Sequence, residues 1–342
     1  MKKNSFRIVE IIAYLYLLCP IIIFVIGFLK WYWAIIFTAF ICIAGYFSLK
    51  ESSVKGLIIE KKNDQIILWV LLLIIIWVVL SGIGGCSYQN SDHECRTAIF
   101  RALVEKDWPV KTIDGTRGLI YYLAFWLPSA VVGKVLGFEA GYKFQVIWAI
   151  LGIFIVYYLI CLYRKKIDIL PIIFLIFFSG LDYLGLWILG GTGTNLKEAA
   201  HIEWWAMDFQ YSSTTTQLFW VFNQAIPAWV ATMLILNQRT CKNIFFILST
   251  IMLSSTFPFV GLIPISIYCV LNLCIKDKTR FRDIFSVQNI IGVVVIGVIT
   301  LLYLIGNVSG GMIKSDNLSE SIVYEPTAKF IQYGPMSRFS TS

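Results

Sequence analysis

The hydrophobic positions of this chain fall in long uninterrupted runs, unlike the alternating patterns of amphipathic helices or strands. A transmembrane helix needs about 20 consecutive apolar residues. One of these runs, 244–275, is too long for a single transmembrane helix and contains Pro258 and Pro264. We therefore predict two spans within it, 244–257 and 259–275. The sequence thus predicts an all-α polytopic helix bundle of about nine spans, of which the remaining seven are 8–29, 31–49, 66–84, 144–163, 168–189, 217–236 and 288–306.

The composition supports a membrane protein and excludes other classes. Of the 342 residues, 58% are hydrophobic and 14% are charged, and the mean hydropathy is +0.77. Soluble domains carry roughly 25% charged residues, so a soluble fold of this chain would expose very large apolar patches. A soluble enzyme, a disordered chain and a nucleic-acid-binding domain are therefore excluded. We expect a single transmembrane domain over 1–342.

The net charge of +8 reports the orientation of the spans. Lys and Arg concentrate ahead of the first span and in alternate connecting segments, such as Arg164-Lys165-Lys166. Short cytoplasmic loops carry such an excess, so we predict a cell-membrane protein with a cytoplasmic N-terminus. The last segment, 307–342, is then outside. The charge requires neither nucleic acid nor another acidic partner.

This orientation determines the path of the first large outer loop, 85–143. The loop must begin and end outside, because the span that follows it returns to Arg164-Lys165-Lys166. The apolar stretch 118–137 is therefore predicted to lie along the outer surface or to dip in and return. Ahead of it, 96–108 places apolar residues on one helix face and predicts another surface helix. The alternative is that 118–137 crosses the membrane.

Acidic and basic side chains in this loop form the first candidate site. Two surface helices over a bundle would enclose a site open to water and to lipid. A carboxylate held there can act as a general base toward an acceptor hydroxyl, which makes Asp92 and Glu94 the catalytic candidates. The alternative is that both acids only solvate a loop. Basic residues that could hold a phosphate leaving group are Arg96, Arg101 and Lys134.

This plan resembles the GT-C superfamily of membrane glycosyltransferases, which use polyprenyl-phosphate-linked sugars. The stretch 119–128, continuing through Lys134-Val135-Leu136-Gly137, is similar to the family's second surface helix, and the span ending at Tyr163-Arg164-Lys165-Lys166 is similar to its return span. The resemblance covers about 66–240. The resemblance implies that the donor is a lipid-linked sugar in the membrane and that an acid of this loop is the catalytic base. That acid corresponds to Asp92 here, with Glu94 as the second candidate.

The chain also departs from the family's pattern. Residues 1–49 form an extra N-terminal hairpin, and 241–306 supplies fewer further spans than the family usually has. No large outer C-terminal domain follows, and an incomplete version of a longer relative would end in the same way at Ser342. These departures bear on whether this chain is active.

The second outer loop, 190–216, supplies further candidate substrate-binding residues. Asp182 lies about seven residues from the outer end of its predicted span, roughly 10 Å deep, and acids at such depth are usually functional. The loop itself is rich in acids and aromatic rings, as sugar-binding loops are. The alternatives are a packing role for Asp182 and a membrane-interface belt for the rings. The candidates in the loop are His201, Glu203, Trp204 and Asp208.

Cysteine and histidine offer weaker signals. Cys86 and Cys95 share the first outer loop, where a disulfide and two free thiols are both open. His93 and His201 each neighbour acids, which leaves a divalent metal possible, although solvated loop histidines are the simpler interpretation. No Cys/His spacing indicates a structural zinc site. The sequence therefore requires no cofactor.

We interpret the chain as a glycosyltransferase that moves a sugar from a polyprenyl phosphate to an acceptor outside, and a lipid-linked-sugar polymerase is a related possibility. One alternative is a transporter or flippase with Asp182, Asn223 and Gln224 along its pathway. Most spans are apolar throughout and no inverted repeat is evident, which disfavours a pathway through the bundle. The other alternative is an assembly subunit without chemistry.

Overall fold

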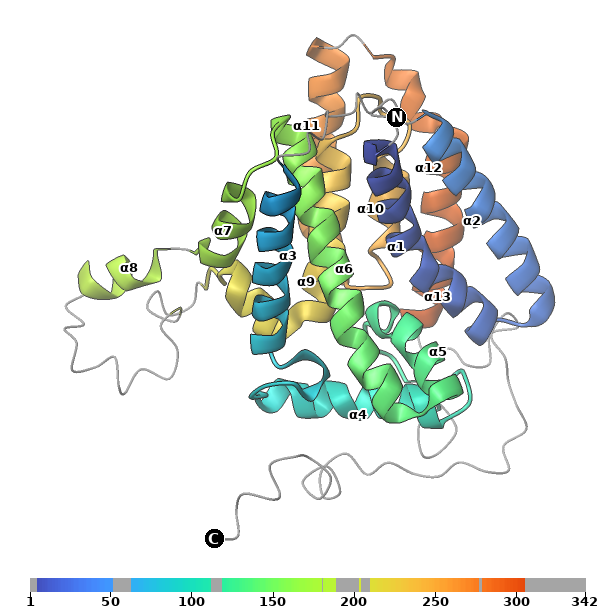
Figure 1. Ribbon diagram of the computed structural model, residues 1–342. Coiled ribbons are helices and arrows are strands. Elements are labelled where there is room, and N and C mark those ends of the chain that lie inside the picture. The colour runs from blue at the N-terminus through green and yellow to red at the C-terminus, as the bar shows by residue number, and fades with distance from the viewer. Residues whose placement is uncertain are drawn as a thin grey trace, which may run out of the picture.

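A computed structural model describes residues 5–51, 63–111, 119–179, 181–188, 203, 210–276 and 279–304. All regular secondary structure in these residues is helical (Figure 1). Seven helices are long and apolar enough to cross a membrane, which confirms the predicted all-α, multi-pass class. They are α1 (Ser5–Phe28), α2 (Trp31–Glu51), α3 (Asn63–Leu80), α6 (Phe138–Arg164), α9 (Thr214–Leu236), α11 (Thr256–Lys276), and the continuous stretch of α12 (Val287–Ile291), η6 (Gly292–Ile296) and α13 (Gly297–Leu304).

The predicted span 168–189 is interrupted. It contains α7 (Leu170–Phe177) and α8 (Asp182–Ile188), because Phe178 leaves the helical conformation and Leu181 adopts a φ of +59°. The last carbonyls of α7 are satisfied by the start of α9. The Thr214 hydroxyl donates to the Leu175 carbonyl, and the Thr215 hydroxyl donates to the Ile176 carbonyl at 2.6 Å. These bonds replace the continuation of the helix.

The predicted span 244–257 is also shorter than expected. Helix α10 (Ile244–Thr250) gives way to turns before α11 begins at Thr256. The hydroxyls of Ser249 and Thr250 donate to carbonyls three residues back, a pattern that competes with regular helix. Residues 251–255 therefore make the turn between the two segments, and the predicted break at Thr256-Phe257-Pro258 is wrong because these residues lie in α11.

Helix α6 runs through the middle of the bundle (Figure 1). It packs against α1, α3, α5 and α9. At Gly152 three helices meet so closely that a Cβ atom would lie 2.4 Å from Ile226 of α9 and 2.5 Å from the Tyr16 hydroxyl of α1. This central helix carries its first turns to one end of the bundle, where the candidate site lies.

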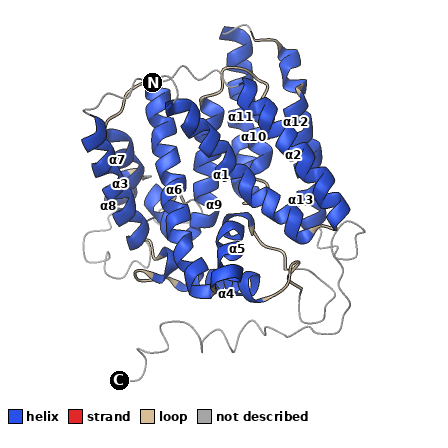
Figure 2. Cartoon of the chain, turned by 45° about the vertical axis from the view of Figure 1, so that its right-hand side comes forward, coloured by secondary structure: helices blue, strands red, loops and turns tan. Residues whose placement is uncertain are grey.

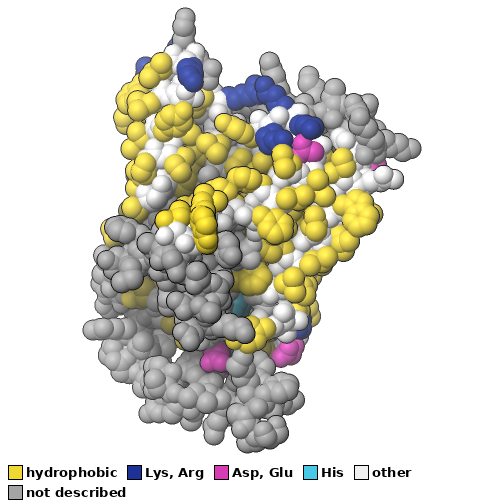
Figure 3. Space-filling model, turned by 90° about the vertical axis from the view of Figure 1, so that its left-hand side faces the viewer, with side chains coloured by type: hydrophobic (Ala, Val, Ile, Leu, Met, Phe, Trp, Pro, Cys, Tyr) yellow, Lys and Arg dark blue, Asp and Glu magenta, His cyan; other side chains and the backbone are white. Residues whose placement is uncertain are grey.

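The opposite end of the bundle, here termed the basic end, gathers cationic side chains. Lys242 pairs with Glu51 at 2.9 Å, and Arg164 and Lys166 pair with Asp168 at 2.9 and 3.1 Å. Figure 3 shows Lys and Arg at the upper end of a face whose middle is covered by hydrophobic side chains. Basic side chains from separate connecting segments thus lie together at one end of the bundle.

The other end is crossed by shorter helices and is termed the α4 end. Figure 2 shows α4 (Ser91–Glu105) and α5 (Leu127–Leu136) at this end. The short helices η1 (Ile83–Gly85) and η2 (Ala124–Trp126) precede them in the sequence. Helix α4 contains most of the predicted helix 96–108 and begins earlier. Helix α5 covers only the second half of 118–137, and its 10 residues extend about 15 Å, half of a hydrocarbon core.

Candidate functional site

The predicted catalytic acids lie in the first turn of a helix, whereas the sequence suggested a loop. Asn90 caps α4: its Oδ1 accepts hydrogen bonds from the backbone N–H groups of Asp92 and His93, at 3.1 and 3.3 Å. Asp92 and Glu94 follow in the first turn, where negative charge is favourable. Glu94 is exposed, and the Asp92 side chain is 46% exposed. The helix thus presents a carboxylate to solvent from a fixed backbone.

Arg96 is the one predicted phosphate-binding cation that contacts Asp92 within the described residues. Its Nη2 donates to Asp92 Oδ2 at 2.9 Å, and its side chain is only 6% exposed. The guanidinium lies 5.9 Å from the centre of the Phe222 ring of α9. Its Nε and Nη1 atoms are buried without a hydrogen-bond partner in the described part of the chain. The site therefore holds unused N–H donors beside a carboxylate.

His93 is buried, which corrects the simpler prediction of a solvated loop histidine. It is 3% exposed, and its ring stacks on Phe222 at 5.6 Å. Nε2 lies 3.0 Å from the Phe219 carbonyl oxygen, which can only accept, so Nε2 carries the proton. Burial, helped by the charge of Arg96, lowers the pKa of His93 below its ordinary value of 6.5. His93 is therefore neutral at pH 7.

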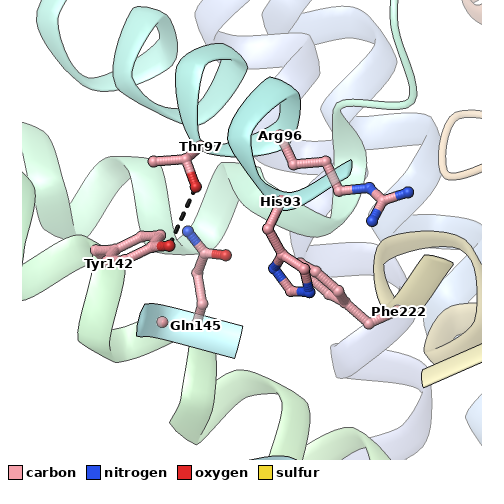
Figure 4. A pocket seen from close by; sticks show the side chains of 7 residues that line it. His93, Arg96, Thr97, Tyr142, Gln145 and Phe222 are labelled. Atoms are coloured by element: carbon pink, nitrogen blue, oxygen red, sulfur yellow. Dashed lines mark hydrogen bonds between the residues drawn. The ribbon is translucent and has the colours of Figure 1, made fainter. Parts of the chain in front are cut away.

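A second group of polar side chains fastens α4 to α6 (Figure 4). Gln89 Nε2 donates to the Gly82 carbonyl and to the Tyr142 hydroxyl, both at 2.7 Å, and the Tyr142 oxygen lies 3.1 Å from Thr97 Oγ1. Nearby, Gln145 is buried, and its Nε2 has no partner among the described residues. These groups border a small cavity with room for about one water molecule, lined by Gly84, His93, Arg96, Thr97, Tyr142, Gln145 and Phe222.

Sequence reasoning missed several of these residues. Gln89, Asn90, Tyr142, Gln145 and Phe222 were not among the candidates. Asn90 ahead of two acids is a typical helix N-terminus, and Tyr142 and Gln145 are polar residues three apart at the start of an apolar span. Both signals were present in the sequence. The contribution of Phe222 has no local signal, because it depends on how α9 meets α4.

Arg101 and Lys134 are engaged elsewhere and do not line this cavity. Arg101 Nη1 pairs with Glu105 at 2.9 Å, and the guanidinium carbon Cζ of Arg101 lies 3.9 Å from the Phe138 ring centre. Lys134 Nζ donates to the Lys106 carbonyl and lies 5.2 Å from the Trp108 ring centre. Burial lowers the pKa of Lys134. These contacts fasten α4 to α5 and α6.

Glu203 caps α9 instead of facing the cavity. Its Oε1 accepts from the Ser213 backbone N–H at 3.0 Å and from the Thr216 hydroxyl at 2.6 Å, and its Oε2 accepts from Gln210 at 3.0 Å. Burial raises the pKa of Glu203, but the bonds from Thr216, Ser213 and Gln210 outweigh it and leave the pKa below its ordinary value of 4.5. Its carboxylate is thus fully used within the fold.

The remaining predicted binding residues are not brought to the cavity by the described structure. Asp182 is buried, but it begins α8 after a break in the chain and does not sit inside the continuous span that was predicted. His201, Trp204 and Asp208 lie outside the described residues.

In the described residues the two outer-loop cysteines form no disulfide, and no cluster of possible metal ligands is present. Cys86 and Cys95 are both exposed free thiols. No three His, Cys, Asp or Glu side chains of the described part of the chain lie close enough together to hold a metal ion.

Comparisons with protein-family models, with curated proteins and with solved structures found no match. The site is therefore interpreted from its own residues. A half-exposed carboxylate can take a proton from a hydroxyl, and a buried guanidinium with unused N–H groups can donate to an anion. A buried neutral histidine fixes the helix on which both stand.

Proposed function

We propose that this protein is a membrane glycosyltransferase of the GT-C kind, which transfers a sugar from a polyprenyl phosphate to an acceptor on the outer face of the cell membrane. One observation carries the proposal. Directly after the membrane-length helix α3, α4 holds the Asp92 carboxylate 2.9 Å from the buried Arg96, whose remaining donors are unused. A base and an anion-binding group thus stand side by side at one end of the bundle.

In this reaction Asp92 accepts the proton of the acceptor hydroxyl while the hydroxyl oxygen attacks the anomeric carbon of the sugar. The bond from that carbon to the phosphate oxygen breaks, and its electron pair leaves with the polyprenyl phosphate. Arg96 would donate to the departing phosphate through Nε and Nη1. Both atoms are buried beside a cavity with room for about one water molecule, so the guanidinium must turn outward to reach the phosphate. Such positioned donors are worth more in a site that excludes water.

The short helices of the α4 end support a route by which a lipid-linked donor could reach the site from within the membrane. Helix α5 is too short to cross and leaves apolar Val131, Val135 and Leu136 exposed. We propose that α5 lies at the outer membrane surface with these side chains in lipid, so that the polyprenyl chain approaches sideways. The basic end then faces the cytoplasm, as Lys and Arg generally do.

The test is release of polyprenyl phosphate by the full chain in lipid nanodiscs. The probes are a panel of polyprenyl-phosphate-linked sugars, supplied with a membrane extract as the acceptor source. Asp92→Asn is expected to lower the rate at least 100-fold, the usual contribution of a general base. Glu139→Gln, which changes an exposed acid on α6 at the same end, is the matched control and should keep the wild-type rate.

Two results would overturn the proposal. One is wild-type turnover by both Asp92→Asn and Glu94→Gln, which eliminates both candidate bases. The other is the absence of release from every donor by the wild-type chain. Glu94→Gln separates the two candidate bases, because loss of transfer in that variant alone would move the role from Asp92 to Glu94.

A further inference from the structure

Helix α9 is broken beside the candidate site. Val221 has φ −138° and ψ 34°, far from helical values. A helical hydrogen bond from residue i+4 to residue i spans the three residues between them. Three helical bonds span Val221, and the one from the Asn223 N–H to the Phe219 carbonyl is among those that this conformation distorts. The Phe219 carbonyl therefore lies at the break in α9.

Two side chains of the start of α4 use this carbonyl. Asn90 Nδ2 donates to the Phe219 oxygen at 3.1 Å, and His93 Nε2 donates to it at 3.0 Å. A carbonyl oxygen has two lone pairs and accommodates both donors. The same Asn90 side chain caps α4 through its Oδ1. The first turn of α4 is thus fastened to the break in α9.

Asp92 lies between these two donors in the sequence. Its backbone N–H is held by Asn90, and its carboxylate is held by Arg96, whose guanidinium lies over Phe222. The His93 ring stacks on the same Phe222 ring. The position of the Asp92 carboxylate is therefore set by the residues on either side of Val221.

The α9 segment that receives these contacts is itself fixed. Its first turn is capped by Glu203 through Ser213 and Thr216, and the Thr214 and Thr215 hydroxyls bind the end of α7. The segment from Thr214 to the break at Val221 is a short platform anchored at its start. His93 attaches α4 to the far end of that platform.

We propose that His93 is a positioning residue: its Nε2–H bond to the Phe219 carbonyl at the α9 break holds the Asp92 carboxylate in place for proton transfer. The effect on transfer rests on the proposed function, whereas the fastening of α4 does not. His93 touches no reacting atom in this proposal and acts only through Asp92.

Two variants separate the hydrogen bond from packing. His93→Gln keeps an N–H donor at nearly the same reach, and His93→Phe keeps a ring against Phe222 but has no donor. Hydrogen–deuterium exchange of the full chain in nanodiscs measures how firmly the first turn of α4 is held. Exchange of the amides of 93–97 is expected to be about tenfold faster in His93→Phe, the effect of one lost buried hydrogen bond, and close to wild type in His93→Gln.

Transfer kinetics supply the second measurement. His93→Phe should lower kcat about tenfold with little change in KM, because the carboxylate is misplaced while substrate binding remains, and His93→Gln should restore kcat. Equal behaviour of the two variants in exchange would overturn the fastening, since packing alone would then explain the burial of His93. Restored exchange in His93→Gln without restored kcat would overturn the positioning role. Absence of transfer by the wild-type chain would overturn the proposed function, and the fastening would then stand or fall on the exchange result alone.

Discussion

Arg96 reaches Asp92 through a single nitrogen: Nη2 lies 2.9 Å from Oδ2, while Nε and Nη1 of the same guanidinium are buried without a partner in the described residues. The pair is uneven, because the cation is 6% exposed and the anion is 46% exposed. Burying a cation costs desolvation free energy, and a single hydrogen bond to Asp92 offsets only part of that cost for Arg96. Arg96 is thus costly to the fold and suited to binding an anion.

The first prediction follows from this imbalance. Asp92→Asn leaves the buried Arg96 without a counter-charge and should lower stability by about 1 kcal/mol. Arg96→Met removes the cation and should restore part of that loss in the double variant, with a coupling energy of about 1 kcal/mol. Thermal unfolding of the four proteins in the same detergent measures the cycle. Additive effects of the two substitutions would show that the pair does not interact.

The second prediction concerns the Glu203 cap of α9. Glu203→Gln cannot satisfy the donors of Ser213, Thr216 and Gln210 equally well and should cost about 1 kcal/mol at pH 7. The pKa of Glu203 is lowered in the fold, so its stabilisation is present above the ordinary value of 4.5 and is lost as the pH falls through the lower folded pKa. The melting difference between wild type and Glu203→Gln should therefore shrink below pH 4.5. A difference that stays constant into acid would contradict the cap.

The fold class was predictable because apolar runs of membrane length are unambiguous, and the seven long helices follow them closely. The breaks were not predictable. The run 168–189 contains a stop at Phe178 because Thr214 and Thr215, distant in sequence, supply hydrogen bonds to the α7 carbonyls of Leu175 and Ile176. Hydrophobicity alone reports that a segment can be buried, and does not report whether its helix is continuous.

The candidate site was predictable only in part. Asp92 and Arg96 are four residues apart on one helix, so their pairing is a local property that a sequence reveals once the helix start is recognised. The burial of His93 depends on Phe219 and Phe222, which reach it only because α9 breaks at Val221. Arg101 and Lys134 shared the charge of Arg96 but face other partners. A positive charge in the same loop was therefore not enough to predict which basic side chain contacts Asp92.

The third prediction concerns the pH response of His93. Its pKa is lowered chiefly by burial, with a contribution from Arg96, while Asp92 and the Phe219 and Ser81 carbonyls oppose the shift. Protonation would also place an Nδ1–H toward the Gln89 amide, whose two N–H bonds go to Gly82 and Tyr142. The contribution of neutral, buried His93 to the stability of the fold is thus complete above pH 6.5, the ordinary pKa of histidine. It is lost as the pH falls from there toward the lower pKa that His93 has in the fold.

Thermal unfolding of wild type and His93→Gln between pH 8 and pH 5 checks this response. Wild type should lose stability relative to the variant as the pH falls, because glutamine does not titrate. Parallel profiles for the two proteins would contradict a titrating, buried His93.

The fourth prediction uses a close approach of α5 and α6. A Cβ atom on Gly141 would lie 2.6 Å from the Ser129 carbonyl oxygen and 2.7 Å from Gly133 Cα, both of them backbone atoms that cannot rotate away. Gly141→Ala should therefore destabilise the chain by about 1–3 kcal/mol. Gly297→Ala is the matched control, since a Cβ there meets no atom of the described residues within 4 Å. Equal melting of the two variants would show that α5 is not packed on α6 in this way.

The fifth prediction tests which end of the bundle faces outward. Cys86 and Cys95 are exposed free thiols at the α4 end, and Lys165 is an exposed residue at the basic end. If basic segments stay in the cytoplasm, a membrane-impermeant maleimide should label the chain on intact cells, and Cys86→Ser with Cys95→Ser should abolish that labelling. Adding Lys165→Cys to this double variant should restore labelling only after the cells are permeabilised. Labelling of Lys165→Cys on intact cells would invert the bundle, place Asp92 in the cytoplasm, and remove the outer-face acceptor from the proposed reaction.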